Sequence, residues 1–331
     1  MITSKSISSR CLLGVDTGGS KTHALVAGLN GEALGFGKAG PGNYESVGYD
    51  GVAQATGDAV DEALLMAGLE KDTVCAAGFG VAGYDWPSER QPTVQVIQTL
   101  GLNCPFELVN DAVIGLLAGA SQEWGLVVNA GSGNNVRGLD REGREGRITG
   151  EGLMFGEFGG ASELVMKALH GISYEWTKRG VVTALTPAFI QLVGAKNVED
   201  LLEGLSVGKY ELNSQAAQLV FQIAMQGDEV AQEVIAWSAR ELGQSAVGVI
   251  RQLNLEKETF EVIMMGSLFN GGELFIKPLR EIIQDEAPGA QLVSLEVPPV
   301  VGAVLLASKV CGLDPKTIRN KLVDTTKVLL A

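Results

Sequence analysis

Two short glycine-rich segments carry the residue types that hold a phosphate group. The first begins where an apolar run ends in a carboxylate, Asp16, and continues with small, polar and basic residues: Thr17, Gly18, Gly19, Ser20 and Lys21. Glycines let backbone N–H groups turn toward an anion, hydroxyl and ammonium groups add donors, and a carboxylate suits Mg²⁺. The second segment, Gly131, Ser132 and Gly133, has a similar composition. Two such turns predict a pair of loops that hold a polyphosphate from both sides.

For each segment taken alone, the structural alternative is a tight β-turn without a ligand. The first segment also comes close to the nucleotide-binding pattern GxxxxGK[ST], with Gly14 and Gly19 at the right separation, but Ser20 precedes Lys21. That pattern opens a helix. Here the apolar runs 11–15 and 23–29 on either side predict the two strands of a hairpin.

Asp111 is the candidate general base. It follows Asn110 and the apolar run 106–109, which predicts a strand, and ligands of open α/β sheets bind at the carboxyl ends of strands. A carboxylate at that position accepts the proton of an attacking hydroxyl group. The alternative is that Asn110 and Asp111 only form a turn or cap the helix predicted for 112–120.

Two further segments have both a chemical and a structural interpretation. Residues 78–83 fit GxGxxG after a predicted strand, as in dinucleotide-binding enzymes, but Tyr84-Asp85-Trp86-Pro87 stands where the helix should begin. Residues 156–162 predict a glycine-rich helix start, either a binding site for a polar substrate or an ordinary helix start. His23 and His170 are expected to be structural.

These motifs lie on a pattern of elements that occurs twice. Three strands joined by a glycine-rich turn are predicted near residues 12–37 and again near 125–155, the last strand of the second set covering 147–155. This indicates an internal duplication. Helices are predicted for 50–67, 86–100, 229–253, 273–286, 300–310 and 315–330, and residues 162–255 are mostly helical. The pattern predicts an α/β fold with two lobes that face each other across a cleft.

Composition narrows the class of protein. The 331 residues suffice for about two domains, and the net charge of −14 argues against general binding to nucleic acid or to anionic membranes. Glycine, at 44 residues, is in excess, which predicts tight turns and close approaches of the backbone to a ligand. The four cysteines lack zinc-site spacing. Residues 1–10 are polar and lack a signal-peptide pattern, so we expect a cytoplasmic protein without a membrane span.

In order along the chain, the motifs resemble those of the BadF/BadG/BcrA/BcrD ATPase family, within the superfamily of sugar kinases, Hsp70 and actin, and in particular those of N-acetylglucosamine kinases. The resemblance runs from about Leu12 to Gly312 and rests on the segments 14–22, 40–44, 80–83, 109–112, 131–135, 224–231, 265–267 and 299–303. It implies two actin-like ATPase (ribonuclease H-like) lobes, 1–118 and 119–312, the second with a helical insertion. A C-terminal helix, 313–331, is expected to pack back on the first lobe.

The resemblance also implies a role for each site residue. Asp111 is implied as the catalytic base and Asp16 as the Mg²⁺ ligand. The residues implied to bind ATP are Thr17, Gly18, Gly19, Ser20, Lys21, Gly131, Ser132, Gly133, Gly227, Gly266 and Ser267. Those implied to bind the sugar are Asn43, Gly83, Asn110, Gly150, Glu151 and Glu157. The activity implied is ATP-dependent phosphorylation of a hydroxyl group of an amino sugar, N-acetylglucosamine or glucosamine, and we expect a homodimer.

One segment departs from the family pattern. In N-acetylglucosamine kinases the residues after the third strand resemble GWGxxxGDEGS, whereas here Glu151 replaces the Trp, Glu157 the sugar-binding Asp and Phe158 the following Glu. A longer carboxylate places its oxygens farther from the backbone, which changes or abolishes sugar binding. Two alternatives therefore stay open: an ATPase that drives a conformational change in a partner enzyme, and a non-catalytic sugar sensor.

Overall fold

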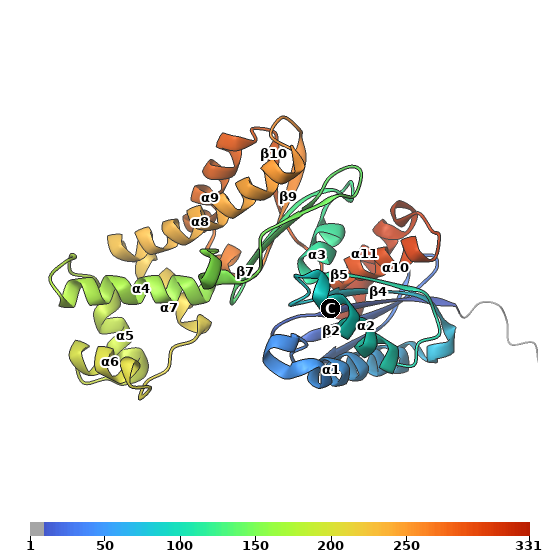
Figure 1. Ribbon diagram of the computed structural model, residues 1–331, viewed down its shortest axis with the longest axis horizontal. Coiled ribbons are helices and arrows are strands. Elements are labelled where there is room, and N and C mark those ends of the chain that lie inside the picture. The colour runs from blue at the N-terminus through green and yellow to red at the C-terminus, as the bar shows by residue number, and fades with distance from the viewer. Residues whose placement is uncertain (1–9) are drawn as a thin grey trace, which may run out of the picture.

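The computed structural model describes residues 10–331, which form two lobes of mixed strands and helices (Figure 1). Residues 1–9, on which the expectation about a signal peptide rests, lie outside the described part of the chain.

The first lobe is built on a five-stranded sheet in the order β3-β2-β1-β4-β5. Its strands are β1 (Cys11–Thr17), β2 (Thr22–Gly28), β3 (Ala33–Ala39), β4 (Val74–Val81) and β5 (Phe106–Asn110). Helices α1 (Tyr44–Ala67) and α2 (Arg90–Thr99) cover one face, and α10 (Val300–Val310) covers the other. Alternate residues of β1 enter the two cores, Leu13 with Val15 on one side and Leu12 on the other. Burial on both faces explains the continuous apolar run.

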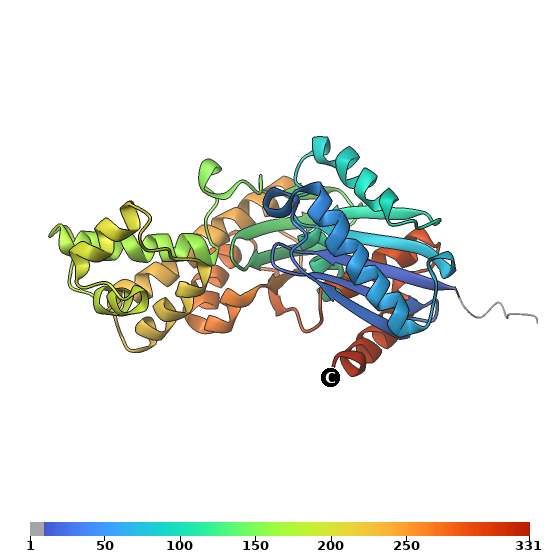
Figure 2. The same ribbon diagram turned by 90° about the horizontal axis from the view of Figure 1, so that it is seen from below.

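The second lobe has a sheet in the order β10-β9-β6-β7-β8. Its strands are β6 (Gly125–Ala130), β7 (Asn134–Leu139), β8 (Glu145–Arg147), β9 (Phe260–Met265) and β10 (Ala290–Ser294). Helix α3 (Asp111–Gly119), which continues from β5 of the first lobe and packs on α10, lies against one face of this sheet. Helix α8 (Glu229–Leu253), which packs on α9 (Glu273–Glu286), covers the other face. Helices α4 (Ala161–Trp176), α5 (Leu185–Val193), α6 (Val198–Ser206) and α7 (Ala217–Met225) lie farthest from the first lobe (Figures 1 and 2).

The two sheets share one topology. In each, the first three strands are antiparallel, and the last two run parallel to the first. The predicted duplication and the two-lobed actin-like fold are therefore confirmed. The strand predicted for 147–155 is wrong in extent, because β8 ends at Arg147 and residues 152–155 form a 3-10 helix. Gly150, Gly152 and Gly156 all have positive φ, which is incompatible with an extended strand.

Several glycines serve packing between elements. A Cβ on Gly14 of β1 would lie 2.5 Å from the Val304 nitrogen, and one on Gly78 of β4 would lie 2.1 Å from the Ala303 oxygen. Helix α10 thus rests directly on the first sheet. The glycine excess, which we predicted to reflect close approach to a ligand, reflects in part close approach of helices to strands. Gly78 and Gly80 lie inside β4, and no helix begins there, so the GxGxxG alternative is wrong.

The chain returns to the first lobe before residue 312. Helix α10 packs on β1 and β4, although the sequence-based division placed 300–312 in the second lobe. Helix α11 (Pro315–Leu330) packs on α10 and β3, and the Ala33 N–H donates to Thr325 Oγ1 over 2.9 Å. Figure 2 shows α11 beside the first sheet. We propose a boundary near 296–299 in place of 312.

The expectations about membrane-spanning helices and about the cysteines can be compared with the described residues. Between residues 10 and 331, no helix is both long and apolar enough to cross a membrane. All four cysteines are free, with Cys11 and Cys75 buried and Cys104 and Cys311 partly exposed.

Candidate active site

The carboxyl ends of three strands of the first sheet meet in one row. Thr17 of β1 lies beside Val81 of β4, and Val81 lies beside Asn110 of β5. Asp16 comes one residue before this row and Asp111 one residue after it. Strands are about 4.8 Å apart, so β1 and β5 are separated by about 10 Å. Asp16 and Asp111 therefore share one edge of the sheet.

The first glycine turn connects β1 and β2 at this edge. The Gly18 N–H donates to the Lys21 carbonyl over 2.9 Å and closes the turn, and the Thr17 hydroxyl donates to the Gly80 carbonyl over 3.2 Å. Gly19, Ser20 and Lys21 are exposed, and a Cβ on Gly19 would meet nothing within 4 Å. The predicted hairpin is confirmed, and its tip has room for a ligand.

The second glycine turn connects β6 and β7 in the other lobe. The Gly131 N–H donates to the Gly133 carbonyl over 2.9 Å, and Ser132 and Gly133 are exposed. The start of α4 lies against this turn, because the Ala161 N–H donates to the Gly131 carbonyl over 2.9 Å. This N–H group was a candidate for binding a polar substrate, and it is occupied by the protein itself.

Gly266 and Ser267 lie beside the second turn. Gly266 has a φ of 108°, and a Cβ there would lie 2.3 Å from the Ala130 oxygen. Only glycine fits this position. Gly227 is placed differently, in the exposed turn between α7 and α8, and among the described residues no hydrogen bond joins it to either glycine turn.

Asn110 joins the elements around Asp111. Its Oδ1 accepts from the Ala112 N–H at 2.9 Å and from Asn135 Nδ2 at 3.2 Å, and its Nδ2 donates to the Tyr84 carbonyl and to Asp85 Oδ1. The side chain is 2% exposed, and two donors and two acceptor positions are used. Asn110 therefore positions its neighbours in this structure, whereas the family resemblance implied that it binds the sugar.

Asp111 has an environment suited to a base. One carboxylate oxygen accepts from the Ala112 N–H over 2.9 Å, and no protein donor is bonded to the other within the described chain. Burial and the charge of Asp85 raise the pKa of Asp111 to about 6, while Arg137 and the backbone N–H act in the opposite direction. A carboxylate with this pKa is ionised at neutral pH and still basic enough to accept a proton.

The protein alone stabilises the ionised form of Asp16 poorly. Burial, and next the charge of Asp111, raise the pKa of Asp16 to about 8, and Lys21 only partly opposes them. Across residues 10–331, no group of three or more His, Cys, Asp or Glu side chains could form a metal cage. Mg²⁺ is commonly held by one or two carboxylates together with substrate phosphates and water. The residues present fit that kind of site.

The loop before α1 lies against the first glycine turn. The Gly42 N–H donates to the Gly18 carbonyl over 2.9 Å, and Asn43 caps α1 by accepting from the Glu45 N–H. A Cβ on Gly83 would lie 2.7 Å from Asn43 Oδ1. Two of the residues implied to bind the sugar, Asn43 and Gly83, are therefore direct neighbours.

The other implied sugar ligands lie in the second lobe. Glu157 is 9% exposed, and its two oxygens accept from the backbone N–H groups of Thr149 at 2.6 Å and Gly150 at 2.9 Å. Glu157 thus shapes its own loop, because each oxygen of its largely buried carboxylate accepts from a backbone N–H group. Glu151 is exposed and accepts from Trp86 Nε1 of the first lobe over 3.0 Å.

Sequence reasoning missed the residues through which the two lobes touch near Asp111. Arg137 of β7 forms a buried ion pair with Asp85, which follows β4, and Arg147 stacks on the Trp86 ring at 4.6 Å. A signal was present, because a charged residue inside the run Val136-Arg137-Gly138-Leu139 requires a partner once the strand is buried. The sequence could not name that partner, which lies in the other lobe.

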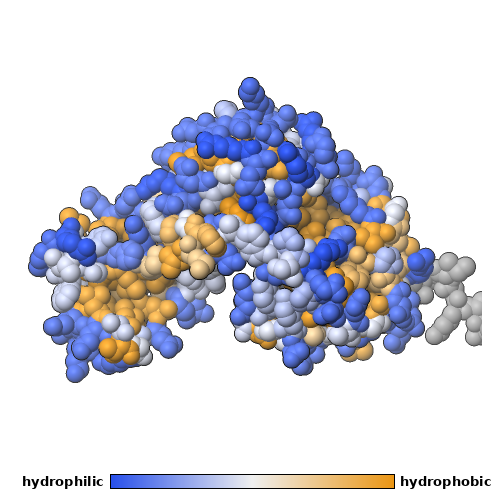
Figure 3. Space-filling model, in the orientation of Figure 1, coloured by the Kyte–Doolittle hydropathy of each residue, from blue (hydrophilic) through white to orange (hydrophobic). Residues whose placement is uncertain are grey.

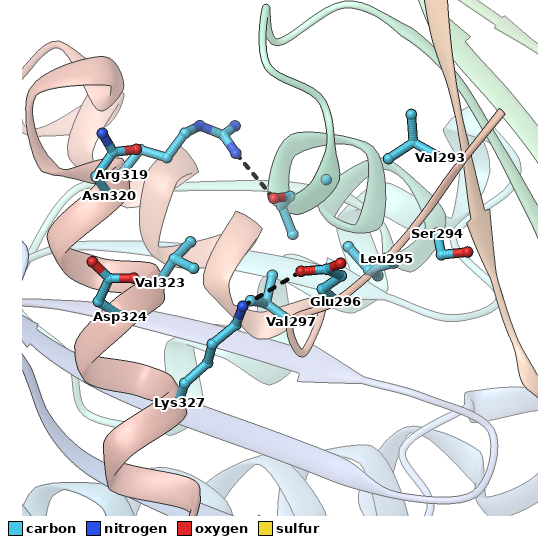
Figure 4. Close-up of a pocket in the computed structure, with 12 residues that line it drawn as sticks. Val293, Ser294, Leu295, Glu296, Val297, Arg319, Asn320, Val323, Asp324 and Lys327 are labelled. Carbon is cyan, nitrogen blue, oxygen red and sulfur yellow. Dashed lines mark hydrogen bonds and ion pairs between the residues drawn. The ribbon is translucent and has the colours of Figure 1, made fainter. Parts of the chain in front are cut away.

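A pocket of about 400 Å³ lies elsewhere, where α11 meets the connection after β10 (Figure 4). Arg319 crosses it to donate to the Ala118 carbonyl over 2.9 Å, and Lys327 pairs with Glu296 at 3.5 Å. None of the site residues predicted from the sequence line it. The predicted site instead lies where the lobes face each other, and Figure 3 shows the surface notched between them.

Two duplicated lobes, with a glycine turn from each at the ends of their first strands, define the class of actin-like nucleotide-binding proteins. The sequence model of the BadF/BadG/BcrA/BcrD ATPase family matches residues 13–307, and the chain belongs to this family.

Named relatives and solved structures resemble the chain over most of its length. An N-acetylmuramic acid/N-acetylglucosamine kinase of Clostridium acetobutylicum is 27% identical over 91% of this chain and 99% of its own. An N-acetyl-D-glucosamine kinase of Dictyostelium discoideum is 26% identical over 91% of this chain and 98% of its own. A crystal structure from Chromobacterium violaceum, of a candidate N-acetylglucosamine kinase, has a TM-score of 0.69 at 22% identity and covers 91% of this chain and 99% of its own, which supports the fold.

Proposed function

We propose that the protein is an ATP-dependent kinase that phosphorylates a hydroxyl group of an amino sugar, N-acetylglucosamine or glucosamine. The observation that carries the proposal is the contact between Asn135 and Asn110 at 3.2 Å. Asn135 follows the second glycine turn, and Asn110 precedes Asp111, so this contact brings the proposed phosphate loop of one lobe to the proposed base of the other. The names of the relatives, both kinases of N-acetylated sugars, supply the substrate class.

In the proposed reaction, the oxygen of the sugar hydroxyl attacks the terminal phosphate of ATP while Asp111 accepts the hydroxyl proton. The bond between that phosphate and the bridging oxygen breaks, and ADP leaves. The N–H groups of the two glycine turns, with Ser20, Lys21 and Ser132, hold the phosphates, and Gly266 and Ser267 border the adenosine. Asp16 would hold Mg²⁺, which neutralises phosphate charge when it is bound. Catalysis then consists mainly of positioning and charge stabilisation.

The acceptor end would be formed by Asn43 and Gly83 of the first lobe and by Gly150 and Glu151 of the second. Gly150 lies against Asp85, since a Cβ on it would be 2.7 Å from the Asp85 carboxylate. Glu151 is exposed and, among the described residues, its carboxylate accepts no backbone N–H group of its own loop, whereas the Asp85 carboxylate is held by Arg137. The Glu151 side chain is the candidate for hydroxyl recognition.

The experiment is ATP turnover with Mg²⁺, with and without glucosamine, N-acetylglucosamine, N-acetylmuramic acid or glucose. Formation of a sugar phosphate with one amino sugar, at a rate far above hydrolysis alone, is the expected result. ATP hydrolysis that no sugar stimulates would overturn the proposal and favour the ATPase that acts on a partner enzyme. ATP binding without any turnover would favour the sensor.

The homodimer and the cytoplasmic location belong to the same proposal. Leu153, Met154 and Phe155 are between 59% and 80% exposed, a run of apolar side chains that a second copy would cover. Sedimentation at micromolar concentration distinguishes monomer from dimer, and Met154→Glu is expected to shift a dimer toward monomer.

A further inference from the structure

A strip of three residues on the second sheet, Asn135, Arg137 and Arg147, faces the first lobe. Asn135 and Arg137 are two residues apart on β7, so their side chains share a face, and Arg147 of β8 lies directly beside Arg137. Each of the three contacts a different residue of the first lobe. Asn135 bonds Asn110, Arg137 bonds Asp85, and Arg147 stacks on Trp86.

The central contact of this strip is buried. The Arg137 side chain is 3% exposed and that of Asp85 is 12% exposed. Arg137 also pairs with Glu145 of its own lobe, and its Nη2 reaches the Tyr84 carbonyl at 3.5 Å. Among the ion pairs within residues 10–331, both partners are this well buried only in Asp85–Arg137. The loss of Arg137 would leave the Asp85 carboxylate buried without its cation, whereas the loss of Asp85 would leave Arg137 with Glu145 as its remaining partner.

The pair leads directly to the candidate base. Asp85 Oδ1, which accepts from Arg137, also lies 3.3 Å from Asn110 Nδ2, and Asn110 caps the helix on which Asp111 is the first residue. A displacement of Arg137 is therefore transmitted through Asp85 and Asn110 to Asp111. Strand β7, which carries Arg137, begins directly after the second glycine turn.

We propose that Arg137 is a positioning residue, and that its ion pair with Asp85 is a cross-lobe clasp that fixes Asp111 relative to the second glycine turn. The clasp rests on the proposed function, because it sets the distance between a base and a phosphate loop. Arg137 touches neither reacting atom. It acts through Asp85, Tyr84 and Asn110.

The first test is a double-mutant cycle on turnover. Arg137→Gln is expected to lower kcat about 100-fold, because a small displacement of reacting groups has an effect of this size. The KM for ATP stays within threefold, since backbone N–H groups hold the phosphates. Asp85→Asn gives a similar loss, and the double variant is no worse than the poorer single one, because residues that act as one unit are not additive. Arg137→Lys keeps the charge and recovers part of kcat.

Arg280→Gln is the matched control. It removes an ion pair with Glu273 in the same lobe, where both partners are exposed, and kcat should not change. If Arg137→Gln does not fold, as judged by its melting temperature, the double variant and Arg137→Lys carry the test. A kcat within threefold of wild type in Arg137→Gln, or effects of the two single changes that multiply, would overturn the proposal.

The second test needs no activity and separates the clasp from the kinase proposal. Amide hydrogen exchange of the protein without ligands should be faster in Arg137→Gln than in wild type for residues 83–90 and 134–151, and unchanged in Arg280→Gln. Equal exchange in all three proteins would overturn the clasp. Faster exchange in a protein that phosphorylates no sugar would support the clasp and refute the kinase.

Discussion

Asp111 is the residue on which the proposed chemistry depends most directly. Asp111→Asn keeps the size of the side chain and the helix start but removes the proton acceptor. We expect turnover to fall at least about 100-fold, the contribution of a positioned general base, while the affinity for ATP stays within threefold. Steady-state turnover and calorimetric ATP binding are the measurements. Turnover within tenfold of wild type would end the assignment of Asp111 as the base.

The pH dependence of the reaction should report the same group. Burial and the charge of Asp85 raise the pKa of Asp111 to about 6, well above the ordinary value for Asp. With Mg²⁺ and ATP saturating, which favours the ionised form of Asp16, the unprotonated form of Asp111 is the active one. The kcat/KM for the sugar is then expected to be level above about pH 7 and to fall about tenfold per pH unit below about pH 6. A profile from pH 4 to 8 at constant ionic strength tests this. A fall in kcat/KM that begins only near pH 4 would show that burial and Asp85 do not raise the pKa of Asp111.

His23 gives a second pH dependence, in stability. It is 9% exposed, packs on Phe36 at 5.1 Å, and burial with the charges of Lys21 and Lys38 lowers its pKa to about 4. The folded state therefore disfavours protonation. The stability from this neutral histidine is complete above the unfolded pKa near 6.5 and is lost as the pH falls toward 4. Up to about 3 kcal/mol should disappear between pH 7 and 4.

Urea unfolding at several pH values measures this loss. His23→Gln cannot be protonated, so its unfolding free energy should depend less steeply on pH than that of the wild type. Equal slopes for the two proteins would show that the burial of His23 does not contribute to the pH dependence.

Sequence reasoning located single residues better than their partners. Asp16 and Asp111 could be predicted because each follows a short apolar run, and the sheet brings such positions to one edge. The state of Glu157 could not be predicted, because a carboxylate in a glycine-rich loop can turn toward a ligand or toward its own backbone. The Asp85–Arg137 pair could not be predicted either, since its members are 52 residues apart and belong to different lobes.

At the scale of elements, direct contact between the backbones of α10 and α3 at a glycine holds helix α10 in place. A Cβ on Gly302 would lie 1.8 Å from the Ile114 oxygen of α3, while Gly248 of α8 has nothing within 4 Å. Both are glycines within helices. Gly302→Ala is expected to cost at least about 3 kcal/mol of unfolding free energy, because the two backbones must separate. Gly248→Ala should gain up to about 1 kcal/mol from helix propensity. Urea unfolding compares them, and equal stabilities would show that α3 and α10 do not cross as described.

The sequence predicted the bounds of some helices correctly and missed others, because it does not show backbone conformation or backbone contacts. Both 229–253 and 300–310 were predicted as helices with the bounds they have. The first has one broad apolar face, and the second is largely apolar and is buried on all sides from residue 300 to residue 308. The start of α1 was missed, since Gly48 has a φ of 66° and interrupts the helical pattern there. The glycines of β1 and β4 suggested contacts with a ligand, because the sequence does not show that the backbone of α10 lies against them.

At the scale of the molecule, the first lobe is assembled from the two ends of the chain. Its strands end at residue 110, and the helices that complete it begin at residue 300. Helix α11 also reaches α3, because Arg319 donates to the Ala118 carbonyl over 2.9 Å. The first lobe therefore cannot finish folding until the last helix has been synthesised, and α11 is part of its core.

This arrangement predicts a large effect of a residue near the C-terminus on overall stability. Leu322 of α11 is fully buried against the core between α10 and the first sheet, whereas Val328 of the same helix is 78% exposed. Leu322→Ala is expected to lower the unfolding free energy by about 2–5 kcal/mol through lost burial and the cavity it leaves. Val328→Ala should change it by less than about 0.5 kcal/mol. Urea unfolding followed by the fluorescence of Trp86 alone, with the other tryptophans replaced by Phe, reports on the first lobe. If Leu322→Ala left that transition unchanged, α11 would be an appendage rather than part of the lobe that carries Asp16 and Asp111.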